Sequence, residues 1–248
     1  MKSKLMKLRF SRTCCLVSVV MMSWLPCAPA HAADAPAASA PAWQRSAQLG
    51  AQLIVAAEAG DTAAVQRLLA AGAGISARDA RGRTAMLAAT HANQVAAARL
   101  LLDAGADVNA QDNIQDSAFL YAGAQGRLEI LRLMLRPGAK SAPDFSVRNR
   151  YGGNALIPAC HYGHVETVRE LLKTKIDIDH VNNLGWTALL ETVILGDGGA
   201  RYVEITQLLL AHGASAKIAD RSGVTPLAHA RSRGHAGIAR LLERATGI

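Results

Sequence analysis

A short pattern recurs along most of this 248-residue chain at a nearly constant spacing. Each copy opens with a polar residue, continues with small and apolar residues, and in most copies reaches a pair of leucines. The opening residues are Thr84, Ser117, Asn154, Thr187 and Thr225, which are 33, 37, 33 and 38 residues apart. Such a period is typical of a solenoid, in which each unit buries its apolar face only by stacking on its neighbours. The repeat therefore constrains the fold more strongly than any single motif.

Each repeated position has a structural explanation, and together they predict a pair of helices in every unit. The opening Thr, Ser or Asn can accept hydrogen bonds from the free amide groups at the start of the first helix. A glycine is expected to end that helix in a turn, at Gly126, Gly163, Gly196 and Gly234. The second helix carries core leucines and is expected to end at a left-handed glycine cap, at Gly72, Gly105, Gly138 and Gly213.

The pattern resembles the ankyrin repeat family in three stretches, Thr225-Pro226-Leu227, Gly163-His164-Val165-Glu166 and Gly105-Ala106-Asp107-Val108-Asn109. This resemblance implies an all-α fold, an ankyrin-repeat solenoid of about six helix-turn-helix units with β-hairpin-like finger loops. The first unit lacks the opening signature, as terminal capping repeats often do. The ankyrin repeat domain is expected over residues 49–248, with units at about 49–82, 83–115, 116–152, 153–185, 186–223 and 224–248.

Two units are longer than the period allows. Extra residues lie near 141–153, between a helix and a finger, and within 195–205, between the two helices of the fifth unit. Insertions in a solenoid map to loops rather than to the core. The stretch Asp197-Gly198-Gly199 lacks the spacing of a phosphate-binding loop and follows no predicted strand, so we interpret it as a plain turn.

The first 32 residues are predicted to be a secretory signal peptide. A basic head is followed by an apolar run and by the small-residue cleavage pattern Ala30-His31-Ala32. The run is shorter than the roughly 20 apolar residues that span a bilayer, so we expect no stable membrane insertion. Residues 33–48, rich in Ala and Pro, are predicted to be a linker. We therefore expect export to the periplasm of a Gram-negative bacterium.

Cleavage of this segment would change the charge and the cysteine content of the chain. Of 27 Lys and Arg residues, five lie in the signal peptide and 22 remain, against 19 Asp and Glu. Because no basic block survives in the rest of the chain, we expect no nucleic-acid partner. Of the four cysteines only Cys160 remains, so no internal disulfide can form and the fold must depend on its hydrophobic core.

The cluster Cys160-His161-x-x-His164 combines residue types that bind zinc or copper. In register with the other units, however, Cys160 occupies a small buried position and His164 is the ordinary histidine of the inter-helix turn. A helix broken at Gly163 would also fail to hold both histidines on one rigid face. We predict no metal site and no other cofactor. Since the chain has no GxSxG, HExxH or CxxC motif, we predict that it is not an enzyme.

Function is expected on the concave face formed by finger loops and first helices. The aromatic and arginine residues there are of the types that dominate binding hot spots. The resemblance implies a non-catalytic, monomeric module that binds another protein, with an accessory or protective role beside an envelope enzyme. Alternatives are an immunity or inhibitor protein for a secreted toxin and, from another class, a small metal-dependent enzyme. The predicted protein-binding residues are Arg81, Arg83, His91, Arg150, Tyr151, His161, Tyr162, Leu184, Trp186 and Arg221.

Overall fold

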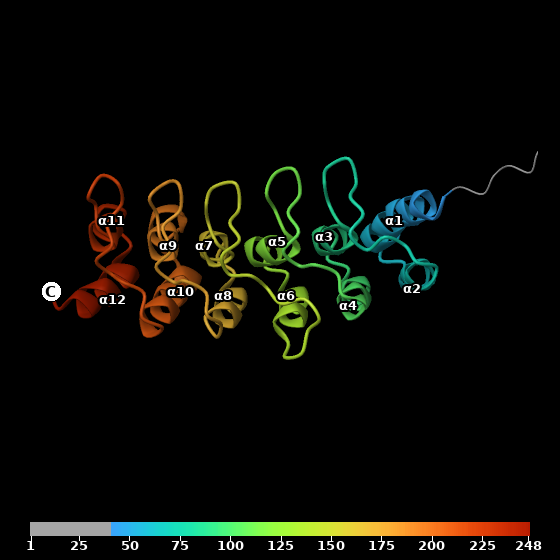
Figure 1. Cartoon of the computed structure of the whole chain (residues 1–248). Coiled ribbons are helices and arrows are strands. Elements are labelled where there is room, and N and C mark those ends of the chain that lie inside the picture. The colour runs from blue at the N-terminus through green and yellow to red at the C-terminus, as the bar shows by residue number, and fades with distance from the viewer. Residues whose placement is uncertain (1–40) are drawn as a thin grey trace, which may run out of the picture. The chain divides into compact units, whose positions relative to one another are not determined.

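The computed structural model describes residues 41–248, and the predicted signal peptide and the first half of the predicted linker lie outside this range. The described residues form twelve α-helices and no strand, which confirms the predicted all-α solenoid. Figure 1 shows them as successive helix pairs with a finger loop between most pairs. The helices are α1 (Ala42–Ala59), α2 (Thr62–Ala70), α3 (Ala85–His91), α4 (Val95–Ala104), α5 (Ala118–Ala124), α6 (Leu128–Leu135), α7 (Leu156–His161), α8 (Val165–Leu171), α9 (Ala188–Leu195), α10 (Ala200–Ala211), α11 (Pro226–Ser232) and α12 (Ala236–Thr246).

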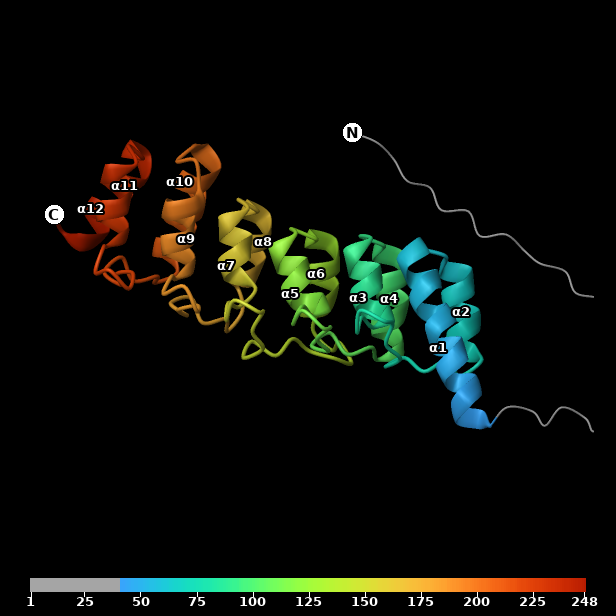
Figure 2. The ribbon, with the colours of Figure 1, turned by 90° about the horizontal axis from the view of Figure 1, so that it is seen from above.

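The twelve helices lie in two rows. The odd-numbered helices, which we call the inner helices, contact one another in sequence from α1 to α11, and the even-numbered outer helices do the same from α2 to α12. The fingers extend beyond the inner helices on one side of the array (Figure 1), and Figure 2 shows the pairs stacked one after another. Each unit therefore packs against its immediate neighbours only, as expected for a solenoid. No helix within residues 41–248 is long and apolar enough to span a membrane.

The opening polar residues cap the inner helices as predicted. The hydroxyl oxygens of Thr84, Ser117, Thr187 and Thr225 each accept a hydrogen bond from the backbone amide three residues later, at 3.2–3.3 Å. The Asn154 side chain accepts from the amide of Ile157 in the same way, at 3.3 Å. Each hydrogen bond satisfies an amide group that has no partner within its helix, and all but the Ala228 amide are buried.

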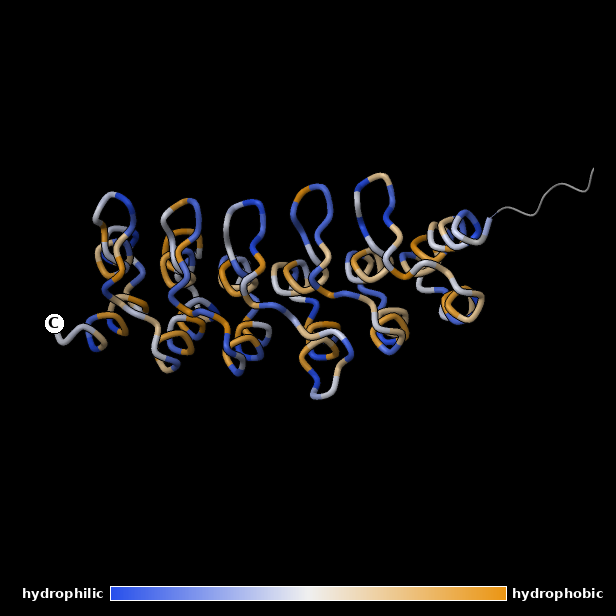
Figure 3. Tube along the Cα trace, in the orientation of Figure 1, coloured by the Kyte–Doolittle hydropathy of each residue, from blue (hydrophilic) through white to orange (hydrophobic). Residues whose placement is uncertain are grey.

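A polar turn repeats at the base of every finger. The side-chain oxygen of an Asp or Asn accepts backbone hydrogen bonds from residues two and four positions further on, as in Asn182 with Leu184 and Trp186, both at 3.0 Å. The same arrangement recurs at Asp79, Asp112, Asn149 and Asp220. Such side chains close a turn without help from a strand partner. The fingers are thus hairpin-like turns, polar in composition, while apolar residues gather in the helices (Figure 3).

One boundary prediction was wrong, and one helix end has a different cause from the other units. The linker was expected to extend to residue 48, but α1 already begins at Ala42, which makes it the longest helix of the described chain. Gly196 ends α9 as expected, but its backbone is not left-handed, with φ −73°. A Cβ atom there would lie 2.4 Å from the Thr192 carbonyl oxygen and 2.6 Å from the Tyr202 ring, so glycine is needed for close packing. The left-handed residue of this turn is Gly198, with φ +72°.

The insertion near 141–153 is a loop, and it is anchored to the preceding repeat. The Phe145 ring contacts the ring of the buried Phe119 edge-on, with centroids 5.7 Å apart. Asn109 donates from its side chain to the Ala142 carbonyl at 2.9 Å and accepts from the Asp144 amide at 2.8 Å. The extra residues therefore cover core between units without disturbing the stacking of α5 on α7.

Candidate functional site

A groove of about 480 Å³ crosses the inner face of units two to five; we call it the inner groove. It is built from finger residues and from the exposed sides of the inner helices, so four separate units contribute to one surface. Its lining residues are His91, Ile114, Asp116, Tyr121, Ala124, Gln125, Asn149, Arg150, Tyr151, Gly153, Ile157, Pro158, His161, Tyr162, Asn182, Leu184, Glu191 and Leu195.

Large apolar side chains in the inner groove are exposed to solvent. Tyr151, Tyr162 and Leu184 are 52%, 50% and 49% exposed, and Ile114 and Leu195 are also exposed. Scattered apolar residues on a surface are ordinary, but a contiguous group in a concave site is typical of an interaction surface. Three of these five side chains come from fingers, Leu195 comes from α9, and Tyr162 comes from the turn after α7. The stacking of the units therefore gathers apolar area that no single unit presents alone.

Ring contacts fix the orientation of the aromatic side chains. His91 and Tyr121 stack across the boundary between units two and three, with ring centroids 3.8 Å apart. His161 and Tyr162 stack at 4.4 Å with nearly parallel planes. Burial lowers the pKa of both histidines below its ordinary value, which favours neutral imidazoles. Because these rings are already fixed by stacking, they lose little conformational freedom when a partner binds, which lowers the entropic cost of binding.

A buried carboxylate forms part of the groove's lining. Glu191 is only 6% exposed, and the Asn182 side-chain amide donates a hydrogen bond to its Oε1 at 2.9 Å. Its Oε2 lies 3.7 Å from Nδ1 of His161. Burial raises the pKa of Glu191 to about 7, because the Asn182 hydrogen bond offsets only part of the cost of removing a charge from water.

Asp116 and Arg150 form a second polar group in the groove. Arg150 Nη1 lies 3.5 Å from Asp116 Oδ2, so the start of unit three and the finger near its end meet in the groove. The guanidinium also lies over the Tyr151 ring, 4.7 Å from its centroid. Burial raises the pKa of Asp116, while Arg150 acts in the opposite direction. This arginine therefore already has both an anionic and an aromatic partner within the chain.

Six of the ten predicted binding residues line the inner groove: His91, Arg150, Tyr151, His161, Tyr162 and Leu184. The fingers and inner helices bring them together although they span three units. Trp186 is half-buried and does not line the groove. Arg81 is exposed on its finger. Arg221 is exposed, contacts the backbone of the preceding finger at Asn183, and also lies outside the groove.

The prediction for Arg83 was wrong. Its side chain is 4% exposed and forms ion pairs with Glu58 and Asp79, at 2.9 and 2.8 Å. Glu58 belongs to α1, so this arginine links the first unit to the second and is unavailable to a partner. The finger position alone did not reveal the burial, because the acidic partner is 25 residues upstream.

The sequence-based list missed Ile114, Tyr121 and Glu191, all of which line the groove. Glu191 carried a usable signal. Four residues after the opening polar residue, the other units place Ala88, Tyr121, Pro158 and His229, and only the fifth unit places an acid there. An acidic residue at a position that faces the neighbouring inner helix is expensive to bury and marks a functional candidate.

The three residues of the Cys160-His161-x-x-His164 cluster point to different surroundings. Cys160 is fully buried, and burial raises the pKa of its thiol. His161 lines the inner groove, whereas the His164 ring packs on the left-handed turn at Gly126, where an added Cβ would lie 2.7 Å from its Nδ1. Within residues 41–248 no group of three or more His, Cys, Asp or Glu side chains could hold a metal ion.

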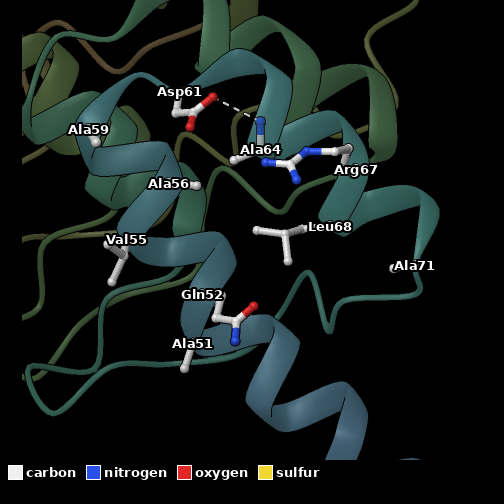
Figure 4. Close-up of a pocket in the computed structure, with 10 residues that line it drawn as sticks. All are labelled: Ala51, Gln52, Val55, Ala56, Ala59, Asp61, Ala64, Arg67, Leu68 and Ala71. Atoms are coloured by element: carbon white, nitrogen blue, oxygen red, sulfur yellow. Dashed lines mark hydrogen bonds between the residues drawn. The ribbon is translucent and has the colours of Figure 1, made fainter.

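A larger hollow, of about 690 Å³, lies between α1 and α2 (Figure 4). Its lining consists of five alanines, Val55 and Leu68, with Gln52, Asp61 and Arg67 as the polar residues. The Asp61 carboxylate accepts from the Ala64 amide as a helix cap. Because the lining is mainly apolar, the hollow presents few polar groups to select a ligand. Its apolar surface corresponds to the end of a stack, where another unit would otherwise pack.

Comparisons with known proteins agree with this geometry. The family model of ankyrin repeats (3 copies) matches residues 53–144 and 119–201. The chain is 50% identical over 101 residues to the ankyrin repeat protein YahD of Escherichia coli (strain K12), covering 40% of this chain and 50% of YahD. It is 39% identical over 80 residues to an ankyrin repeat protein of Rickettsia felis, covering 32% of this chain and 25% of that protein. The chain thus spans half or less of these curated relatives.

Solved structures show the same architecture over a longer span. An ankyrin repeat domain from Acinetobacter baumannii AYE is 53% identical, with a TM-score of 0.75, covering 79% of this chain and 97% of that domain. The ankyrin repeat domain of Bcl-3, a member of the IkappaB protein family, is 30% identical, with a TM-score of 0.69, covering 78% of this chain and 85% of that domain. The protein is therefore a helical repeat solenoid of the interaction-module class. It belongs to the ankyrin repeat family.

Proposed function

We propose that this chain is an exported, non-catalytic module that binds another protein through the inner groove. Ankyrin repeats generally mediate protein–protein interactions, which supports the class of function. The observation that carries the proposal is the group of exposed Tyr151, Tyr162, Leu184 and Ile114 side chains in one concave site. Aromatic and aliphatic anchors in a concave surface are typical of binding hot spots.

Export to the periplasm and an accessory or protective role beside an envelope enzyme complete the proposal. Export is supported by the basic head, apolar run and Ala30-His31-Ala32 pattern at the start of the sequence, which lie outside the described residues. Expression of the full chain in a Gram-negative host tests this part. We expect the periplasmic fraction to contain a product whose N-terminus is residue 33, measured by mass spectrometry of the intact protein. An uncleaved product in the cytoplasm would contradict export.

Affinity capture with groove variants tests the binding surface. The double variant Tyr162→Ala/Leu184→Ala removes two exposed anchors and is expected to keep its helical content and its melting temperature. A matched control, Glu129→Ala, changes an exposed residue of outer helix α6. We expect a protein captured from periplasmic extract by the wild type and the control to be absent with the double variant. Equal capture by all three proteins would contradict the groove as the binding surface.

A further inference from the structure

Two fingers make the same side-chain contact to the inner helix that follows them, with different chemistry. Asp220, at the base of the finger before α11, contacts His229 of α11, with Oδ2 and Nε2 2.8 Å apart. At the finger before α9, the equivalent residues are Asn182 and Glu191, joined by a hydrogen bond of 2.9 Å. Asp220 therefore contacts a histidine directly, at hydrogen-bond distance. The hydrogen-bonded partner of Glu191 is a neutral amide.

No Lys or Arg among the described residues 41–248 forms an ion pair with the Glu191 carboxylate. The titratable groups beside it are His161, at 3.7 Å, and the Cys160 thiol, whose pKa is raised by burial and also by Glu191. Burial lowers the pKa of His161, which favours its uncharged form. The nearby Arg150 is held by Asp116 and by the Tyr151 ring. Removing an acid from water without a partner is costly, so an incoming cation would relieve this cost.

Apolar side chains line the same groove as this carboxylate. Tyr162, Leu184 and Leu195 all line the inner groove and are exposed. A lysine or arginine side chain has a methylene stem that packs on apolar surface and a charged end that seeks an acid. The groove of about 480 Å³ has room for such a side chain. Its chemistry is complementary to a cation carried on an aliphatic stem.

We propose that the inner groove recognises its protein partner through one lysine or arginine side chain, whose charged end pairs with Glu191 while its stem lies against Tyr162, Leu184 and Leu195. This inference rests on the proposed function and specifies the chemistry of the partner. A charge-assisted hydrogen bond in a partly desolvated site is stronger than a neutral one. The pairing would therefore determine which partner segment binds and in which register.

Titration with small probes tests the charge preference directly. N-acetyl-lysine methylamide is compared with N-acetyl-norleucine methylamide, which has a similar stem without the ammonium group, by amide chemical shifts of the purified chain. We expect the lysine probe to bind roughly tenfold more tightly, which corresponds to about 1.4 kcal/mol. The largest shifts should be at Asn182, Leu184 and Glu191. The preference should increase as the pH rises through about 7, where Glu191 loses its proton.

Glu191→Gln removes the charge but keeps the shape and can still accept the hydrogen bond from Asn182. We expect this variant to bind both probes equally, and the control Glu129→Gln on the outer face to retain the preference. Equal binding of the two probes by the wild type, an unchanged preference in Glu191→Gln, or no binding of the lysine probe would each overturn the inference.

The capture experiment separates this inference from the proposed function. If Tyr162→Ala/Leu184→Ala still captures the partner, the groove is not the binding surface and the proposed function fails. If that variant loses the partner while Glu191→Gln captures it with wild-type affinity, the groove binds a protein and only the cation inference fails. If both variants lose affinity and Glu129→Gln does not, both proposals are supported.

Discussion

Arg83 in the second unit donates two hydrogen bonds to the carboxylate of Glu58 in α1, from Nη1 at 2.9 Å and from Nη2 at 3.1 Å. The hydrogen bond from Arg83 is the largest of the effects that lower the pKa of Glu58. The Nε atom of Arg83 also donates a hydrogen bond to Asp79 at 2.8 Å. One buried guanidinium thus connects the N-terminal capping unit to the finger of the first full repeat. The connection is electrostatic and directional, in addition to the apolar packing of α1 on α3.

Replacement of Arg83 by Met should loosen the first unit. Two carboxylates would lose their hydrogen-bonded partner, and both lie close enough to the surface to regain water, so we expect a loss of about 1–3 kcal/mol in the free energy of unfolding. Urea denaturation followed by circular dichroism measures it. The control Arg81→Met removes a mostly exposed arginine 3.8 Å from Glu58 and should cost less than about 0.5 kcal/mol. Equal effects of the two substitutions would argue against a special role for Arg83.

Glu191 should make stability depend on pH. Its pKa is raised from the ordinary 4.5 to about 7 in the folded chain, so the folded state holds the proton more tightly than the unfolded state. The free energy of unfolding should therefore fall as the pH rises from about 4.5 to about 7, by on the order of 3 kcal/mol in total. Below this window the carboxyl group is protonated in both states, and above it the group is ionised in both.

Buried histidines act in the opposite direction, because a lowered histidine pKa costs stability as the pH falls. The contribution of Glu191 is therefore measured as the difference between the wild type and Glu191→Gln across the pH range. We expect the variant to gain relative stability as the pH rises through the window. A difference that does not change with pH would show that Glu191 titrates as an ordinary surface acid.

Cys160 should react slowly with thiol reagents while the chain is folded. The side chain is fully buried and burial raises its pKa, so little thiolate is present to react. Labelling at neutral pH with a chromogenic disulfide, with and without urea, measures the rate. Labelling should require unfolding. The variant Cys160→Ala should lower the free energy of unfolding by only about 1 kcal/mol, because aligned units already place alanine at this position. Rapid labelling without urea would show that α7 opens locally.

Trp186 and Leu184 are expected to have different roles although they lie two residues apart. Trp186 is half-buried outside the groove, so Trp186→Ala should lower the free energy of unfolding by about 2 kcal/mol and change partner binding little. Leu184 is exposed in the groove, so Leu184→Ala should change stability by less than about 0.5 kcal/mol and weaken binding. Measuring stability and affinity on both variants decides between the two roles. The reverse pattern would make Trp186 the anchor.

The repeat, its caps and the fully buried Cys160 could be predicted from sequence because they depend on local chemistry. Thr84 and Ser117 cap helices through amides three residues away, and a period of about 33 residues fixes where the next cap falls. Arg83 could not be placed, since its acidic partner belongs to a capping unit with no opening signature. The inner groove was predicted only in part, because its shape arises from four stacked units.

Gly196 illustrates a different limit. The register of the repeat predicts that the first helix of unit five ends at Gly196, and α9 does end there. Glycine is needed at this position because the Tyr202 ring packs closely against it, and not because the backbone is left-handed. The end of a helix can thus be predicted correctly while its physical cause is assigned wrongly. Glu191 is a case in which the sequence shows an unusual acid at a repeated position, but only the structure shows that its side chain is buried.

The inner groove spans units two to five in an array where each unit packs only on its neighbours. In such a chain, thermal fraying begins at the ends and can also open an interior boundary, because no contact links distant units. A partner lying in the groove would contact several units at once and so connect units that do not contact one another. Occupancy should slow amide hydrogen exchange together in α3, α5, α7 and α9, which are not adjacent in sequence, while α11 and α12 continue to fray as before. The bound partner would make these four stacked units open as one cooperative block.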